Sequence, residues 1–188
     1  MANIFDVSQY LLKLRPDLTE IELHKLCFFA QGWHTAWTGQ PLFPDEMEAW
    51  KHGPVSPQLR RCRRVAGNRV TRIDAGNSDN LSEYERRVIK MVEEFYQNKP
   101  AFGADGMSEL SHGLAWRKAR GELSPDAASS NPISLADIFK EFAQRLYSPE
   151  ITPQLPTYIP KISLDQLEEH LDEIEDQHRD ILRGLAYI

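Results

Sequence analysis

The stretch from residue 23 to residue 55 reads LHKLCFFAQGWHTAWTGQPLFPDEMEAWKHGPV, and it decides the fold. Its first half predicts one long helix, because its apolar side chains recur at alternating steps of three and four residues. These side chains are Leu23, Leu26, Ala30, Trp33 and Trp37. Thr19 and Glu22 have the spacing of a capping box and predict the start of the helix, and Gly39 predicts its end.

Outside this helix, further start signals predict a mainly helical body. Helices are expected to open at Ser56–Pro57, at Ser82 and at Ser134, all of which suit helix N-termini. The last of these helices is expected to bury one apolar face, made of Ile138, Phe139, Phe142 and Leu146. Strand evidence is thin, since residues 69–73 read either as one short strand or as an extended loop. We therefore predict an all-α fold, a compact multi-helix domain.

The chain divides into three parts. Residues 1–147 form the predicted domain, and residues 148–162 contain four prolines, which predict an extended linker. Residues 163–188 predict a C-terminal amphipathic acidic helix, because apolar positions recur there as in heptad a and d positions. Those positions are Leu164, Leu167, Leu171, Ile174, His178, Ile181 and Leu185, with His178 the polar member.

The apolar heptad positions form a seam along this C-terminal helix. The seam must pack against another surface, because a lone helix of this length is marginally stable in water. Three packing partners for the seam are possible: the body of the same chain, a second copy in a homodimer, or a foreign protein. The proline-rich linker gives the helix reach and favours the last two. We take five positions as candidate partner-binding residues: Leu167, Leu171, Ile174, His178 and Ile181.

Charge is unevenly distributed along the chain. The formal net charge is −6, and all of it belongs to residues 147–188. Residues 51–73 contain one lysine and no acidic residue beside six arginines: Arg60, Arg61, Arg63, Arg64, Arg69 and Arg72. This arginine stripe is either a solvated face or a surface for an acidic protein, a nucleic-acid backbone or the acidic C-terminal helix. Arg60, Arg61 and Arg64 are candidate partner-binding residues.

Length and composition exclude several classes of protein. The 188 residues suit one domain with a short appendage. No apolar run approaches the roughly 18 residues of a membrane span, and the N-terminus does not resemble a signal peptide. Cys27 and Cys62 cannot make a disulfide framework. We expect a cytoplasmic protein with no membrane partner. No motif or spacing stands out for catalysis, metal or cofactor binding, so we expect none of the three.

The loop around Trp50 is a candidate interaction site. Trp50 precedes the segment Lys51–His52–Gly53–Pro54, a turn that cannot be helix interior. Tryptophan, arginine and histidine on a stiff loop are typical of binding hot spots. A core position for Trp50 is the competing interpretation.

Three segments together resemble a known family. The first is Lys25–Trp33, the second holds Pro41–Phe43, Glu48–Trp50 and Gly53–Val55, and the third is Leu110–Arg120. In order and spacing they resemble the Panacea domain, the SocA-like antitoxin domain also described as phage-associated. The resemblance covers about residues 4–122. It implies that Trp50, His52, Gly53 and Pro54 shape a shared site together with His112 and Trp116.

The resemblance also implies a function. Panacea domains are helical, non-enzymatic antitoxins of bacteria or prophages that bind a toxin encoded next to them. We therefore expect an antitoxin that neutralises a co-encoded protein toxin by direct binding. The alternative that the resemblance offers is a proteolytic adaptor that delivers the toxin to an ATP-dependent protease. A nucleic-acid-binding module at the arginine stripe is a third hypothesis, which we favour less than the antitoxin.

Overall fold

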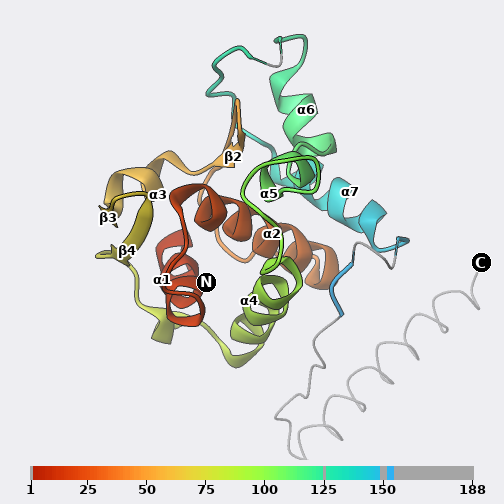
Figure 1. Ribbon diagram of the computed structural model, residues 1–188. Helices are drawn as coiled ribbons and strands as arrows, with labels where there is room; N and C mark the ends of the chain where they lie inside the picture. Colours follow the sequence, from red (N-terminus) through yellow and green to blue (C-terminus); the bar gives the residue numbers. More distant parts are fainter. Residues whose placement is uncertain (1, 125, 149–151, 155–188) are drawn as a thin grey trace, which may run out of the picture. The chain divides into compact units, whose positions relative to one another are not determined.

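Helix α2 (Glu20–Thr38) is the centre of the body (Figure 1). The computed structural model describes residues 2–124, 126–148 and 152–154. The predicted capping box is confirmed, since Thr19 and Glu22 bond reciprocally, and Gly39 ends the helix with a φ of +72°. Every side chain from Leu23 to Thr35 is buried. The helix is therefore surrounded by other elements rather than packed on one face.

Three long helices surround α2: α1 (Ile4–Leu14), α4 (Glu83–Tyr96) and α7 (Leu135–Arg145). The view in Figure 1 places α1 and α4 on one side of α2, and α6 (Leu114–Arg120) and α7 on the other. Shorter pieces complete the body: α3 (Pro57–Cys62), the 3-10 turn η1 (Ser78–Asn80) and α5 (Met107–Leu110). The predicted helix starts at Ser56, Ser82 and Ser134 are confirmed.

Aromatic side chains fill the core between α2, α4 and α7. The Phe142 ring lies edge-on to Trp33, with centroids 5.1 Å apart, and 5.5 Å from Phe28. Phe29 stacks on Tyr96 at 4.1 Å. The apolar face predicted for α7 is wrong in part, because Phe139 and Leu146 are exposed.

The all-α prediction is wrong, because the body also contains two antiparallel two-stranded sheets. One pairs β1 (Glu48–Trp50) with β2 (Gly53–Val55), and the other pairs β3 (Arg63–Ala66) with β4 (Arg69–Ile73). These strands are only three to five residues long. They are too short to show the alternation of apolar and polar residues by which a strand is recognised in a sequence.

The C-terminal part of the chain lies outside this description. Residues 149–151 and 155–188 are not described, so the linker is described only at residues 148 and 152–154, and the predicted C-terminal helix not at all. Among the residues that are described, no helix is long and apolar enough to cross a membrane. The same residues hold no cluster of three or more potential metal ligands.

Candidate functional site

The β1–β2 hairpin is held in place through its main-chain carbonyl groups. Four of them accept hydrogen bonds from side chains of other elements, over distances of 2.8 to 3.2 Å. The donors are Arg120 to Ala49, Trp116 to Trp50, Ser108 to His52, and Lys25 to Pro54. Because α2, α5 and α6 supply these donors, the three family-like segments meet at this hairpin.

Gly53 allows the hairpin to turn at this point. Its φ is +97°, a conformation that side chains with a Cβ rarely adopt. A Cβ at this position would also lie 2.8 Å from Cε of Lys25 and closer still to Oγ of Ser111. The close approach of Lys25 and Ser111 to the backbone thus requires glycine here.

Gln31 fixes the segment that leads into the hairpin. Its amide nitrogen donates to the carbonyl of Phe43 at 2.9 Å, and its amide oxygen accepts from the backbone N–H groups of Leu42 and Phe43. The Gln side chain is buried within α2 and uses three of its hydrogen-bonding positions on this loop. The polar residues of the first family-like segment therefore position the second.

Lys25 is a buried amine beside the hairpin. Its side chain is 1% exposed, and its Nζ donates to the Pro54 carbonyl at 2.9 Å. Burial disfavours the charged ammonium and lowers the pKa of Lys25 from 10.5 to about 7. Near neutral pH the buried amine is therefore close to its titration midpoint.

The lowered pKa of Lys25 predicts a pH-dependent stability. Between pH 7 and pH 10.5 the unfolded chain binds more protons at this residue than the folded one, so the free energy of unfolding rises with pH. We expect a gain of about 1 kcal/mol or more between about pH 7 and 8.5. Urea titrations measure it, and Lys25→Met should remove this part of the slope. Parallel pH curves for the two proteins would contradict the assignment.

His24 carries a buried hydrogen-bond donor that lacks an acceptor. Its Nδ1 accepts from the backbone N–H of Ser56 at 3.3 Å, which places the ring proton of the neutral form on Nε2. Burial, with the charges of Lys25, Arg63 and Arg60, lowers the pKa of His24 to about 3, so the ring is neutral. Nε2 is buried without a hydrogen-bond partner, and Oε1 of Glu20 lies 3.9 Å away. An unsatisfied buried donor costs about 1–3 kcal/mol.

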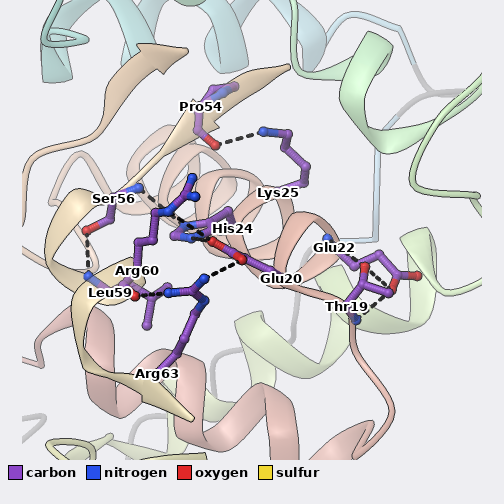
Figure 2. Close-up of polar contacts among 10 residues, drawn as sticks. All are labelled: Thr19, Glu20, Glu22, His24, Lys25, Pro54, Ser56, Leu59, Arg60 and Arg63. Carbon is purple, nitrogen blue, oxygen red and sulfur yellow. Dashed lines mark hydrogen bonds and ion pairs between the residues drawn. The ribbon is translucent and has the colours of Figure 1, made fainter. Parts of the chain in front are cut away.

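A cavity of about 260 Å³ opens between α2, the hairpin and α3. We call it the α2–hairpin cavity, and it is lined by Glu20, Ile21, His24, Lys25, Trp50, Lys51, His52, Val55 and Arg60. Figure 2 shows Glu20, His24 and Arg60 next to one another. The Glu20 carboxylate lies 2.6 Å from Arg63 and 3.5 Å from Arg60. The Arg60 guanidinium in turn lies 5.0 Å from the Trp50 ring.

Acidic residues outside residues 51–73 pair with much of the arginine stripe. Besides the pairs to Glu20, Arg64 and Arg72 both bind Asp74, at 2.7 and 2.9 Å, and Arg69 binds Asp17 at 3.2 Å. Arg61 has no ion pair within the described residues and is exposed on α3. The stripe is therefore a paired surface rather than an uncompensated block of positive charge.

Of the candidate residues that the structure describes, it brings most together. Trp50, His52, Gly53 and Pro54 lie on the hairpin, Arg60 contacts Trp50, and Trp116 donates to the Trp50 carbonyl. His112 stacks on Trp116 with centroids 3.9 Å apart. Arg64 lies apart from them on the β3–β4 hairpin, where it forms an ion pair with Asp74. The candidate positions from Leu167 to Ile181 lie outside the described residues.

Sequence reasoning missed Glu20 and His24 as site residues. Both lie in the first turns of α2, where Glu20 reads as an ordinary first-turn acid. Their partners Ser56, Arg60 and Arg63 are at least 32 residues away in the chain. The one available signal was a histidine directly beside a lysine on an apolar helix.

Comparison with known proteins places this site in a family context. The family model described as antitoxin SocA-like, Panacea domain, matches residues 23–117, a range that contains most of the hairpin's donors. Antitoxin SocA of Caulobacter vibrioides (strain NA1000 / CB15N) is 37% identical over 65 residues, which are 35% of this chain and 35% of that protein. The chain thus matches about a third of the length of this curated relative. No solved structure matches the chain.

Proposed function

Because the chain belongs to the antitoxin SocA-like, Panacea domain family, we propose that it is an antitoxin that binds a co-encoded protein toxin directly and performs no catalysis. The observation that carries this proposal is the convergence of the three family-like segments on one hairpin. A hairpin backbone that is held in place in this way suits a binding surface, since loops held on a rigid scaffold commonly bind partners. We place the interaction in the bacterial cytoplasm.

The surface around the hairpin has the composition of an interface. Lys51 and His52 are exposed at its tip, and Trp50 is half-buried beside them. Phe102, which is 50% exposed, lies edge-on to His52 with centroids 5.7 Å apart. Together with Arg60, these residues supply the aromatic and arginine side chains that dominate binding energy in protein interfaces.

Nucleic acid is less well supported than a protein as the partner of this chain. Phosphate binding depends on arginines that are free to replace counterions. In the arginine stripe, Asp17, Glu20 and Asp74 already lie within 3.2 Å of four guanidinium groups and lower the net positive charge of this face: those of Arg63, Arg64, Arg69 and Arg72. The pairing supports a protein partner for this face.

Co-expression with the adjacent gene tests the proposed function. We expect that gene to arrest growth alone, and this protein to restore growth and to co-purify with the toxin in stoichiometric amounts. Restored growth with loss of the toxin from the cell would instead support the adaptor that delivers it to an ATP-dependent protease. A neighbour that is harmless, or that is toxic and unaffected by this protein, would contradict the proposal.

We propose further that residues 163–188 form part of the toxin-binding surface or a homodimer seam. Their heptad apolar positions and acidic remainder support this role, because apolar burial supplies affinity and charge supplies steering. A chain that lacks residues 161–188 should lose neutralisation but keep the helical circular dichroism of the body. Full neutralisation by the shortened chain would contradict the assignment.

A further inference from the structure

We propose that the α2–hairpin cavity receives an acidic side chain of the toxin, an inference that rests on the proposed antitoxin function. The cavity is the place where the hairpin, α2 and α3 meet, so an inserted side chain would contact all three elements. Four observations carry the proposal: the charge of the lining, an unsatisfied donor, the size of the cavity and the arrangement of Glu20.

The charge of the lining favours an anion. Lys25, Lys51 and Arg60 are basic, His52 adds an imidazole, and Glu20 is the single carboxylate in the wall. Lys51 is paired at 2.8 Å with Asp126, but that pair is largely exposed and therefore weak. A carboxylate that enters the cavity would meet more positive than negative charge.

The unsatisfied Nε2 of His24 is an independent observation that points to an acceptor. The ring lines the cavity, and its backbone contact with Ser56 already fixes the proton on Nε2. A neutral imidazole held in this tautomer donates a hydrogen bond and cannot accept one at that nitrogen. The missing partner is therefore an acceptor such as a carboxylate oxygen, and not a second donor.

The size of the cavity favours a single side chain. At about 260 Å³ it is smaller than the roughly 300–1,000 Å³ typical of small-molecule pockets. Ile21, Val55 and the Trp50 ring supply apolar wall beside the polar groups. Such walls suit the methylene groups of Asp or Glu, and the polar groups suit its carboxylate.

Glu20 occupies a position that leaves Arg60 available. Its carboxylate is close to Arg63, at 2.6 Å, and is more distant from Arg60, at 3.5 Å, and from His24, at 3.9 Å. An incoming carboxylate can pair with Arg60 and His24 while Glu20 stays on Arg63. The two carboxylates would then repel each other, so Glu20 limits the affinity for the toxin.

Calorimetric titration of the adjacent gene product into variants of this protein tests the inference. We expect Arg60→Gln to weaken binding about tenfold or more, since it removes the paired cation. Glu20→Gln should tighten binding about threefold, because it removes the competing charge and keeps the side-chain shape. Arg72→Gln is the matched control, because Arg72 is equally charged, more exposed and outside the cavity. It should change affinity less than about twofold.

The outcomes separate this inference from the proposed function. Equal losses of affinity for Arg60→Gln and Arg72→Gln, or a loss of affinity for Glu20→Gln, would overturn the cavity assignment. The proposed antitoxin function would still stand in that case, provided that the wild-type protein binds the toxin. A wild-type protein that binds no adjacent gene product would overturn the antitoxin itself. Thermal midpoints of all three variants within a few degrees of the wild type ensure that binding, and not folding, is compared.

A double-mutant cycle identifies the inserted residue. Each exposed Asp or Glu of the toxin is changed to its amide, and the affinity is measured against wild-type protein and Arg60→Gln. We expect one acidic residue whose loss costs about tenfold with the wild type and almost nothing with Arg60→Gln. Strictly additive losses at every toxin carboxylate would overturn the proposal.

Discussion

Replacing Gly53 by alanine is expected to abolish neutralisation of the toxin and to lower the free energy of unfolding by about 3 kcal/mol or more. The positive φ of 97° alone costs a residue with a Cβ about 1–3 kcal/mol. The added methyl group would also collide with Lys25, which holds the hairpin from α2, and with Oγ of Ser111 at the end of α5. The turn must therefore open, and Trp50 and His52 would leave their positions.

Gly67→Ala is the matched control for this experiment. Gly67 also has a positive φ, of 63°, but a Cβ there would have no atom within 4 Å. Its substitution should cost only the conformational part, about 1–2 kcal/mol, and should leave neutralisation intact. Urea unfolding and growth rescue measure both effects. Equal destabilisation by the two substitutions would show that contact with Lys25 and Ser111 does not require glycine at residue 53.

Replacing Gly32 by alanine should also destabilise the protein strongly, although glycine-to-alanine changes inside helices usually stabilise by about 1 kcal/mol. A Cβ at Gly32 would lie 2.5 Å from Cζ of Phe142. The Phe142 ring cannot withdraw, because Phe28 and Trp33 pack against it. We expect a loss of about 3 kcal/mol, at the upper end of what overpacking costs.

A second substitution tests the cause of this loss. Phe142→Leu alone should destabilise the core, but the double variant with Gly32→Ala should be more stable than Gly32→Ala alone, because the smaller side chain makes room for the methyl group. Thermal unfolding of the four proteins gives the coupling energy. A Gly32→Ala protein that is more stable than the wild type would show that α2 and α7 do not approach closely at this point.

Local signals in the sequence predicted helix starts well and strands poorly. The capping pair of Thr19 and Glu22 lies within one turn, so its chemistry is complete in four consecutive residues. The β1–β2 hairpin has no such local cause. Pro54 lies within β2, where a sequence pattern argues against a strand. Tertiary hydrogen bonds from Lys25, Trp116 and Arg120 stabilise it instead.

The candidate site shows the same division between local and distant causes. The sequence located the turn after Trp50, since it is visible as a motif, but it did not predict the strands on either side. It could not show that Glu20 neutralises Arg63, because the two residues are 43 positions apart. Nor could it show that Ser56 fixes the tautomer of His24, because the contact exists only once the hairpin has folded against α2.

The carbonyl attachment of the hairpin has an evolutionary consequence. Every residue type carries the same main-chain carbonyl, so replacing the side chain at Trp50, Lys51 or His52 leaves those hydrogen-bond acceptors in place. The geometry of the loop is thus independent of the chemistry displayed on it, as in an antibody, where a constant framework carries variable loops. Selection can exchange the displayed residues, and with them the recognised partner, without rebuilding the scaffold.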